Sequence, residues 1–425
     1  MGQNGLPAAL QARLPFFYGW IVLACVCCAG FARQGPAVAT LSIFVSPMSD
    51  EFGWSRTAIS SAVSLGGILA AVSSPALGPM LDRHGSRVTL SLAVLTTGLA
   101  MMALSLTPAL AVFIALFCIG RMNFAGPFDL GIYGAVNSWF VRKRGLATSI
   151  ANLAQMVGLI AMPLLAQAAI LYDGWRTGWL VIGATVLIVG FLPTWFLVVR
   201  RPEDMGLAPD GDQAPLDDDG SPRPELTQQE PRFTRHQALR TPAFWLLSLY
   251  TLLVFPVQAG ISLHQAPHLI ESGITPTTAA LVVSAFSLAS AISGFGFGLI
   301  VRRISVRVSL AFSSMSMAVG VLLMTAITSP TLAFISAVFF GLGIGGILTV
   351  LPIAWADYFG RRSYGAIRGV ALTVQVVAQA TGPLLSGVLR DLTGNYALSL
   401  WTFAGLVAVS ALVAIAASAP KPPTR

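Results

Sequence analysis

Charged residues are scarce in this sequence: Asp, Glu, Lys and Arg form 10% of its 425 residues, whereas a soluble domain has about 25%. Hydrophobic residues make up 55% and occur in long runs with short polar segments between them. This composition excludes a water-soluble globular protein, a disordered chain and a disulfide-rich scaffold. It indicates a polytopic membrane protein, because each membrane-spanning helix needs about 20 apolar residues.

Cysteine and histidine are also scarce, with four residues of each. The cysteines all lie in apolar runs, where we expect no disulfide and no metal site. His264 and His268 lack a nearby acidic or cysteine ligand, so we interpret them as a solvent-facing pair, with His264 as an outer gate or proton acceptor in the alternative. The sequence contains no nucleotide-binding loop and no nucleophile with a base, so we expect neither an enzyme nor a cofactor.

Apolar runs long enough to cross a bilayer occur twelve times. An even number of spans places both termini on the same side of the membrane. The prediction is therefore an all-α polytopic membrane protein with spans at residues 17–44, 57–79, 88–106, 109–137, 145–170, 177–199, 242–269, 276–300, 307–327, 330–356, 366–389 and 396–418.

Basic residues are distributed unevenly between the two sides of the predicted membrane. Of the 25 Lys and Arg residues, 20 lie on the side of the termini, three lie opposite, and Arg33 and Arg121 lie inside spans. Because cytoplasmic loops are enriched in Lys and Arg, both termini are predicted to be cytoplasmic. The net charge of +8 thus follows from membrane orientation and gives no reason to expect nucleic acid as a partner.

One long polar segment, residues 200–241, separates six spans from six. It contains six prolines and nine acidic residues, so it is predicted to be a flexible cytoplasmic linker, or less simply a regulatory or partner-binding segment. The expected domains are an N-terminal six-helix bundle at 1–199 and a C-terminal six-helix bundle at 242–425.

The two halves show an internal repeat at an offset of 220 residues, or 219 in one segment. The same offset recurs at equivalent places of the span map, which indicates a duplication of a six-helix unit. The repeated positions are Gly78, Asp82, Arg83 and Arg87 with Gly298, Arg302, Arg303 and Arg307, Trp139 and Phe140 with Tyr358 and Phe359, Gln155 with Gln375, and Pro163 with Pro383.

The segment GPMLDRHGSRV, residues 78–88, lies between the second and third spans and resembles the signature loop of the major facilitator superfamily. FVSPMSDEFGWSR at 44–56 and DYFGRRSYGAIRG at 357–369 resemble the bacterial branch of monocarboxylate-transporter-like and oxalate/formate-antiporter-like carriers. The resemblance implies an alternating-access carrier of small organic acids, monomeric in the bacterial inner membrane, often coupled to protons or to anion exchange. The eighth span lacks the basic residue common in that branch, and the eleventh has Gln375 and Gln379 in place of a lysine, so the relatives' substrates do not carry over.

Arg33 and Arg121 are candidates for binding the substrate. Each lies 16 residues from the cytoplasmic end of its predicted span, which places both about 24 Å into the membrane. The resemblance implies that these two spans line the central cavity, where two guanidinium groups would bind a carboxylate bidentately. The alternative is that one or both only hold the bundle together.

Asp129 lies eight residues from Arg121 on the same span, too far for a direct ion pair, so it needs another partner or a proton. A carboxylate buried without a cation readily binds a proton, as proton-coupled carriers require, although a packing role near Pro127 is the alternative. Three glutamines complete the candidate substrate site, although glutamines also join helices within the bilayer: Gln155, Gln375 and Gln258.

Asp82 is expected to interact with the positive end of the eleventh span and its arginines, among them Arg361, Arg362 and Arg368. The resemblance assigns a gating role to this loop, so Gly78, Asp82, Arg83, Gly85, Arg87, Arg361 and Arg362 are candidate gating residues. Ser86 and Arg302 depart from the family pattern, and the second copy is expected to lack a matching latch.

The function expected from these features is secondary transport of a small organic anion, a carboxylate, driven by protons. The alternatives are an efflux carrier for hydrophobic or drug-like compounds, which would normally need an acidic cavity, and a sensor that does not transport. The identity of the anion, the direction of transport and the coupling ion do not follow from the sequence.

Overall fold

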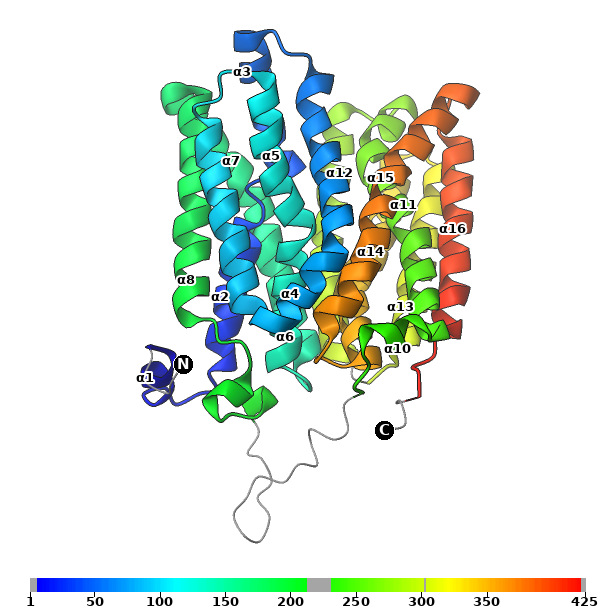
Figure 1. Cartoon of the computed structure of the whole chain (residues 1–425). Coiled ribbons are helices and arrows are strands. Elements are labelled where there is room, and N and C mark those ends of the chain that lie inside the picture. The colour runs from blue at the N-terminus through cyan, green and yellow to red at the C-terminus, as the bar shows by residue number, and fades with distance from the viewer. Residues whose placement is uncertain (1–5, 212–230, 302, 422–425) are drawn as a thin grey trace, which may run out of the picture. The chain divides into compact units, whose positions relative to one another are not determined.

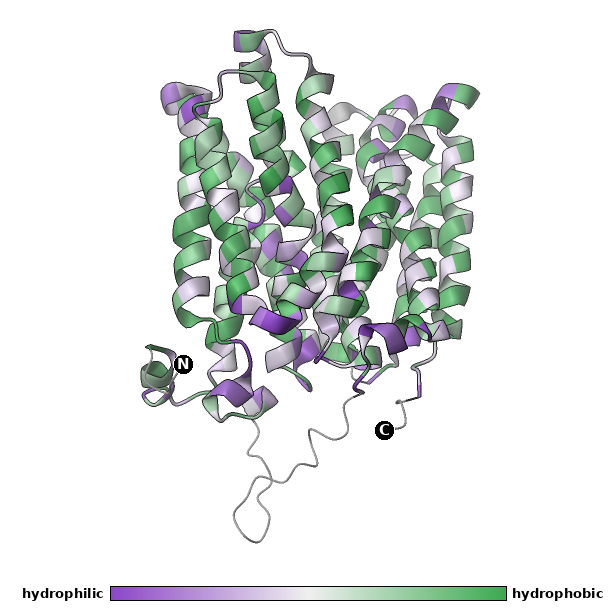
Figure 2. Ribbon diagram, in the orientation of Figure 1, coloured by the Kyte–Doolittle hydropathy of each residue, from purple (hydrophilic) through white to green (hydrophobic). Residues whose placement is uncertain are grey.

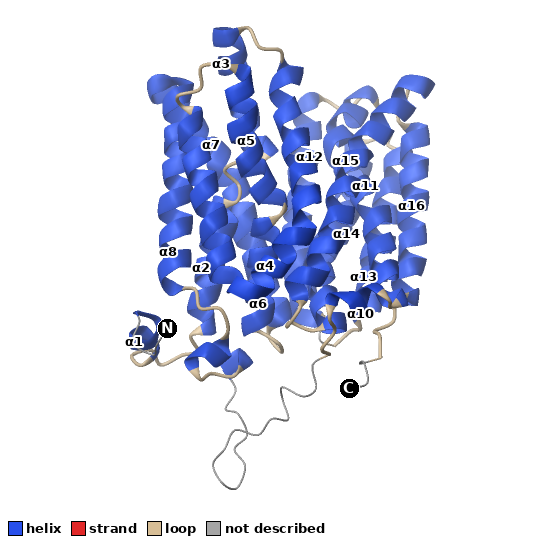
Figure 3. Ribbon diagram, viewed as in Figure 1, coloured by secondary structure: helices blue, strands red, loops and turns tan. Residues whose placement is uncertain are grey.

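The computed structural model describes residues 6–211, 231–301 and 303–421, and these form helices and no strand (Figures 1 and 3). The prediction of an all-α protein is confirmed. Figure 2 shows hydrophobic residues along most of each long helix and hydrophilic residues gathered at helix ends. The central part of the predicted linker, residues 212–230, and Arg302 of the second signature copy lie outside the described residues.

The chain divides into two compact units. The first contains residues 1–232 and 360–373, and the second contains residues 233–359 and 374–425. The early turns of helix α15 (Tyr364–Thr393) therefore belong to the first unit and its remainder to the second. The domain limits at residues 199 and 242 stay a prediction.

The first unit is built from helices of unequal length. Its other helices are α1 (Leu6–Gln11), α2 (Gly19–Ala32), α3 (Val38–Phe52), α4 (Arg56–Leu104), α5 (Leu110–Ala125), α6 (Pro127–Trp139), α7 (Arg144–Thr185), the π-helix η1 (Val186–Phe191), α8 (Leu192–Leu197) and the 3-10 helices η2 (Pro202–Met205) and η3 (Pro209–Gly211).

The second unit contains more uniform helices, several of which begin with a Ser or Thr cap. Thr241, Thr275 and Ser305 each accept a hydrogen bond from a backbone N–H in the first turn. The helices are α10 (Arg235–Leu239), α11 (Pro242–Glu271), α12 (Pro276–Ile300), α13 (Val306–Thr325), α14 (Pro330–Phe359) and α16 (Ala397–Ala416), together with most of α15.

The predicted spans correspond to these helices, although not one to one. In the described part of the chain, nine helices are long and apolar enough to cross a membrane, and α2 is a shorter apolar helix. Two of the nine contain two predicted spans each, because α4 and α7 each consist of two helices joined by a non-helical turn, at Gly85 (φ 81°) and at Gly174 (φ 80°). Only glycine adopts such a positive φ without strain, so it permits these short connections.

Two predicted spans are interrupted in their interior. The first span breaks between α2 and α3, where Pro36 lacks an N–H and Thr40 Oγ1 donates to the carbonyl of Gln34 at 2.8 Å. The fourth breaks at Gly126, just before Pro127 opens α6. Irregular backbone at membrane depth is tolerated only where protein or a cavity surrounds it. Because each of these two spans consists of two helices, the expectation that each is one continuous helix was wrong.

The segment after α8 is ordered, in contrast to the flexible linker that the sequence predicts from residue 200. The buried Asp210 accepts hydrogen bonds from the backbone N–H groups of Val141, Arg142 and Lys143 at 3.0, 2.6 and 2.9 Å. These bonds attach η3 to the loop after α6, because a buried carboxylate needs such donors.

Small residues allow close helix packing in the second unit. Gly341 and Gly345 of α14 face the carbonyl groups of Phe286 and Ser290 in α12, so a side chain at either glycine would collide with backbone. This arrangement is typical of membrane helices, in which small residues four apart bring backbones together.

Candidate functional site

Arg33 and Arg121 meet around one aromatic ring in the first unit. The guanidinium carbons of Arg33 and Arg121 lie 4.5 and 4.4 Å from the ring centre of Phe124. The distance between the two guanidinium carbons is therefore at most the sum of these two distances. Arg121 belongs to α5, whereas Arg33 lies at the end of α2. The structure thus brings together the two arginines that depth counting paired.

Phe124 was missed by the sequence analysis. It lies three residues after Arg121 and so on the same face of α5, which is the signal that identifies it. An aromatic ring stabilises a cation over its face, especially away from water. Phe124 therefore supports two positive charges that would otherwise repel each other.

Asp129 has the partner that the sequence analysis required. Its carboxylate lies between two guanidinium groups, with Oδ1 3.8 Å from Arg33 Nη2 and Oδ2 3.3 Å from Arg368 Nη2. The side chains of Asp129 and Arg368 are only 7% and 2% exposed. Asp129 is therefore not a carboxylate buried without a cation.

Arg368 was counted among the cytoplasmic arginines before the eleventh span, but the structure places it inside α15. It lies in α15, within the part of this helix that belongs to the first unit, and it is fully buried against Asp129. The predicted span already began at residue 366, so Arg368 met the criterion of an ionisable residue inside the membrane. Because Arg368 was counted with the basic residues of the cytoplasmic loops, it was not considered as a charge inside a span.

Gln155 extends this charged cluster. Arg33 Nη1 donates a hydrogen bond of 2.7 Å to Gln155 Oε1, and Gln155 Nε2 donates to Asn152 Oδ1 at 3.3 Å. Asn152 Oδ1 also accepts a 2.7 Å bond from the hydroxyl group of Tyr133. Gln155 therefore orients Arg33.

Arg121 differs from the other two arginines in its contacts. Arg33 and Arg368 share Asp129, whereas no carboxylate of the described residues pairs with Arg121. The Nε atom of Arg121 is buried without a hydrogen-bond partner, as is that of Arg33. The interior of the first unit thus holds three guanidinium groups and one carboxylate in this cluster. A buried excess of positive charge with an unused donor is suited to an anion, because an unpaired buried polar group is costly.

The candidate gating loop is held at the start of α15. The carboxylate of Asp82 accepts hydrogen bonds from the backbone N–H groups of Gly365 and Ala366 at 2.8 and 2.7 Å. Gly78, one helical turn earlier, lies so close to Gly365 that a Cβ at residue 78 would collide with its carbonyl group. The helix N-terminus attracts Asp82 as the sequence analysis expected.

The arginines near Asp82 do not pair with its carboxylate, contrary to that expectation. Arg361 donates to the carbonyl of Ser138 at 2.9 Å and forms an ion pair with Glu203, and Arg368 pairs with Asp129. Arg362 and Arg83 are exposed, and the guanidinium group of Arg87 lies 5.2 Å from the ring centre of Trp195. Gly85 makes the turn described above, closely covered by the side chain of Arg200.

The comparisons with known proteins agree with this architecture. The family model of the Major Facilitator Superfamily matches residues 22–272 and 261–425. The chain belongs to the Major Facilitator Superfamily. It is also similar to the proton:xylose symporter XylE, with a TM-score of 0.72 at 13% identity over 93% of this chain and 94% of that one. At this identity the likeness shows the fold, which is that of the superfamily.

Three curated relatives of this superfamily member cover different shares of its length. The membrane sensor protein UhpC of Salmonella typhimurium is 26% identical over 79% of this chain and 76% of the relative. Monocarboxylate transporter 2 of Homo sapiens is 24% identical over 93% and 84%, and the oxalate:formate antiporter of Oxalobacter formigenes is 25% identical over 48% and 45%. The resemblance stated from the sequence is confirmed, and the superfamily is one of transporters and not of enzymes.

The remaining candidate residues of this superfamily member lie in its second unit. His264 contacts the hydroxyl group of Tyr396 at 3.1 Å and the carbonyl of Pro383 at 3.3 Å, and His268 contacts the carbonyl of Met324 at 2.8 Å. The interpretation of a solvent-facing pair was wrong, because both rings are half-buried and hydrogen-bonded. Within the described ranges, no three His, Cys, Asp or Glu residues gather as metal ligands do.

The glutamines of the second unit have different environments. Gln258 accepts a 3.3 Å hydrogen bond from Gln379 Nε2, and Gln375 is buried like its repeat mate Gln155. Gln265, adjacent to His264 along α11, is 2% exposed and neither of its amide atoms has a partner. Gln265 was not a candidate residue of the sequence analysis, and only its burial in the structure draws attention to it.

Proposed function

We propose that this protein is a secondary transporter that moves a small organic anion, a carboxylate, across the cytoplasmic membrane by alternating access. Arg121 and Arg33 bind the carboxylate, Phe124 supports both, and Gln155 orients Arg33. The orientation with both termini in the cytoplasm follows from the asymmetry of Lys and Arg. Gln375 is assigned to the proposed substrate site as the repeat mate of Gln155, and Gln258 as a glutamine of α11 that bonds Gln379.

The buried Nε of Arg121 supports the proposal most strongly. It is an unused donor beside a second guanidinium group, over a ring that excludes water. A planar carboxylate satisfies the fork of Arg121 with two parallel hydrogen bonds, which is the strongest geometry available to arginine. Retaining three buried guanidinium groups against one carboxylate is otherwise hard to explain energetically.

Proton coupling is assigned to Asp129. A substrate carboxylate bound to Arg33 and Arg121 competes with Asp129 for Arg33 and places a second negative charge nearby. Like charges at close range are relieved when one of them takes a proton, so anion and proton bind together. His264, hydrogen-bonded to Tyr396, is the second candidate for the coupling group.

The gating proposal rests on the contacts at the start of α15. Asp82 accepts two backbone hydrogen bonds there, and Gly78 allows the close approach that makes them possible. We assign Gly85, Arg83 and Arg87 to the same gate because they belong to this loop, and Arg361 and Arg362 because they immediately precede the helix start that binds Asp82. Release of Asp82 from Gly365 and Ala366 would open this contact.

The names of the relatives suggest two different functions. Monocarboxylate transporter 2 and the oxalate:formate antiporter are named for anionic substrates, in agreement with a basic site. UhpC is named as a membrane sensor, which makes sensing the second candidate. Three guanidinium groups disfavour an efflux carrier for cationic compounds.

Uptake into proteoliposomes tests the proposal. The purified protein is reconstituted and offered labelled lactate, pyruvate, oxalate, formate and an aromatic carboxylate, with and without an inward proton gradient. Gradient-stimulated uptake of one acid, lost in Arg121→Gln, supports a proton-coupled carboxylate transporter. If no carboxylate moves but one binds to the purified protein, sensing becomes the better description, and if none binds the anion site is disproved.

A further inference from the structure

Tyr364, the first residue of α15, has a buried hydroxyl group that the proposed function does not use. The residue is 3% exposed, and its hydroxyl group has no hydrogen-bond partner within the described residues. Buried hydroxyl groups are nearly always hydrogen-bonded, because an unpaired donor is costly away from water. The groups on either side of Tyr364 indicate what its hydroxyl group does.

On one side, Tyr364 adjoins the ion pair of Asp129 and Arg368. Tyr364 lies one helical turn before Arg368 on α15, Tyr133 lies one turn after Asp129 on α6, and residues four apart share a helix face. Because Asp129 and Arg368 pair at 3.3 Å, the two tyrosines form the next layer between these helices. The ionisable groups that act electrostatically on the hydroxyl group of Tyr364 are Arg368, Asp129, Tyr133 and Arg144.

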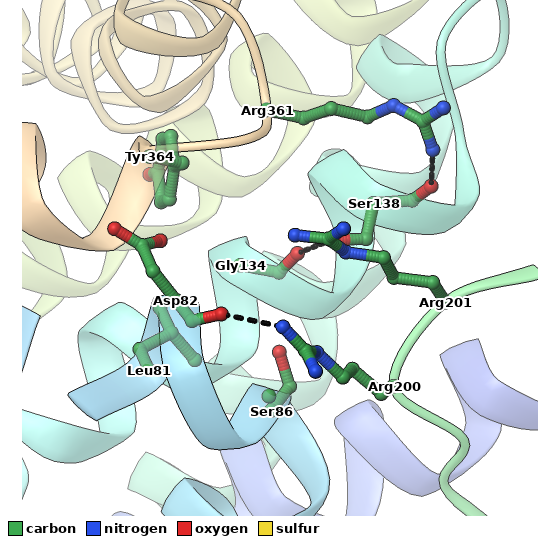
Figure 4. Close-up of a pocket in the computed structure, with 10 residues that line it drawn as sticks. Leu81, Asp82, Ser86, Gly134, Ser138, Arg200, Arg201, Arg361 and Tyr364 are labelled. Atoms are coloured by element: carbon green, nitrogen blue, oxygen red, sulfur yellow. Dashed lines mark hydrogen bonds between the residues drawn. The ribbon is translucent and has the colours of Figure 1, made fainter. Parts of the chain in front are cut away.

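On the other side, Tyr364 lines a small pocket at the ends of the same two helices (Figure 4). Gly134 and Ser138 of α6 line it as well, together with Asp82, whose side chain points toward Tyr364. The enclosed space is sufficient for about one water molecule. Tyr364 therefore adjoins both the ion pair and a polar pocket at the loops that are proposed to be cytoplasmic.

Arginine side chains flank Tyr364 on both sides: Arg144 and Arg368 toward the ion pair, and Arg200, Arg201 and Arg361 around the pocket. Asp129 offsets the first group, and Asp82, Glu203 and Asp204 offset the second. A group that has to become cationic to carry a proton would be repelled by these arginines. A hydroxyl group is suited to this place, because it accepts one proton while it donates another and stays neutral.

We propose that the hydroxyl group of Tyr364 carries the proton between Asp129 and the pocket. This inference rests on the proton coupling proposed for Asp129. When the proton is released, protonated Asp129 passes it to the oxygen of Tyr364, directly or through one water molecule, and Tyr364 passes its own proton to water in the pocket. The products are the Asp129 carboxylate, a neutral Tyr364 and a hydrated proton, so charge and atoms balance.

Tyr133, in the same layer, has a different role. Its hydroxyl group donates a 2.7 Å hydrogen bond to Asn152 Oδ1, which also accepts a bond from Gln155. Gln155 in turn accepts a bond from Arg33. Tyr133 therefore belongs to the hydrogen bonds that hold the proposed anion site, whereas the hydroxyl group of Tyr364 remains available to a proton.

Two modes of transport in proteoliposomes separate these roles. Exchange of labelled for unlabelled carboxylate at equal pH returns the site with its proton, so it requires no proton release. Net uptake driven by an inward proton gradient requires release in every cycle. We expect Tyr364→Phe to lower the initial rate of net uptake about 100-fold, the lower limit for a positioned proton-transfer group, and to leave exchange close to that of the wild type.

Two other tyrosines provide the comparison. Tyr133→Phe should lower exchange and net uptake together. Tyr358→Phe is the matched control in the second unit, where the buried hydroxyl group donates to the carbonyl of Ala417 at 2.7 Å, and it should leave the ratio of the two rates unchanged. Tyr364→Phe removes an oxygen that makes no hydrogen bond, so its melting temperature should equal that of the wild type. The proposal is overturned if Tyr364→Phe lowers both modes equally or lowers neither.

Infrared spectroscopy follows the same proton without any transport. In the purified full-length protein, the C=O stretching band of a protonated carboxylic acid that is missing in Asp129→Asn reports the protonation of Asp129. After a rapid pH jump, this band should change about 100-fold more slowly in Tyr364→Phe than in the wild type. Equal rates, or a wild type without such a band, overturn the proposed route. If the rates differ but no carboxylate is transported, the route stands and the proposed function fails.

Discussion

The two units share a repeat in sequence but bury different kinds of polar group. The first buries charged side chains, among them Asp129, Arg144 and Arg368, whereas the buried polar side chains of the described second unit are Ser, Thr and Gln. The positions 220 residues after Arg33, Arg121 and Asp129 hold Leu253, Gly341 and Thr349. The duplication preserved the spans and not the charges.

The replaced positions show what the second unit does instead. Thr349 donates a hydrogen bond of 3.2 Å to the carbonyl of Gly294, and Gly341 lets α14 approach the backbone of α12. Both contacts hold helices together, and small uncharged residues are sufficient for this. Because a buried charge costs at least about 2.5 kcal/mol at membrane depth, the charges kept in the first unit are candidates for a function.

The largest effect is expected from Asp129→Asn, which leaves Arg33 and Arg368 without their carboxylate. Removing one partner of a buried ion pair costs about 3–5 kcal/mol in unfolding free energy. Thr349→Val, at the repeat-related position, should cost only about 1 kcal/mol, the value of one neutral hydrogen bond. Denaturant unfolding in detergent measures both.

The double variant Asp129→Asn/Arg368→Gln provides the control for this prediction. It removes both charges of the pair, so it should be more stable than Asp129→Asn alone. Equal losses in Asp129→Asn and Thr349→Val would mean that the charged cluster of the first unit contributes nothing beyond ordinary hydrogen bonding.

A smaller free-energy change but a complete functional loss is expected from Arg121→Gln. The initial rate of carboxylate uptake should fall at least about 100-fold, because the bidentate donor fork disappears. The melting temperature should stay close to that of the wild type, since the Nε of Arg121 makes no hydrogen bond that could be lost. Arg121→Lys, which keeps the charge and loses the fork, should recover only part of the uptake.

Arg390→Gln, which alters an exposed ion pair with Glu271 in the second unit, is the matched control for uptake. Its uptake should equal that of the wild type. Uptake at the wild-type level in Arg121→Gln would show that the anion binds elsewhere.

Gly78→Ala is expected to have an intermediate effect. The new methyl group meets the carbonyl of Gly365, and backbone cannot move aside as a flexible side chain can, so the change should cost about 1–3 kcal/mol. Gly296→Ala in the second unit has open space around its Cβ and should be neutral or slightly stabilising. Thermal unfolding of the two variants compares them directly, and equal melting temperatures would contradict the close approach.

The smallest effect is expected from Glu51→Gln. The hydrogen bonds from Arg176 and Trp175 lower the pKa of Glu51, so its contribution to stability is present above the ordinary Glu value and is lost as the pH falls through the lowered pKa. The difference in melting temperature between wild type and variant should therefore be larger at neutral pH than at about pH 3. Glu271, 220 residues later, forms an exposed ion pair with Arg390 in the second unit. A constant difference across this pH range would contradict the assignment.

The sequence analysis predicted most of the fold because the bilayer imposes a local rule on each span. Hydropathy located the spans, and counting residues from the span ends was enough to pair Arg33 with Arg121. The same reasoning failed where the outcome depended on local backbone geometry, as at Gly126 and at the break after Arg33. It also failed at Arg368. This residue was counted as cytoplasmic under the positive-inside rule, although the predicted span at 366–389 already contained it.

The sequence by itself determined the number of spans, the duplication and the presence of ionisable residues in the membrane, because hydropathy and spacing are properties of short segments. Only the tertiary structure decided that Asp129 lies between Arg33 and Arg368, that Arg121 keeps an unused donor, and that Phe124 supports two cations. These contacts join residues from four separate helices. They depend on how the helices pack, and no local pattern encodes which charges will meet.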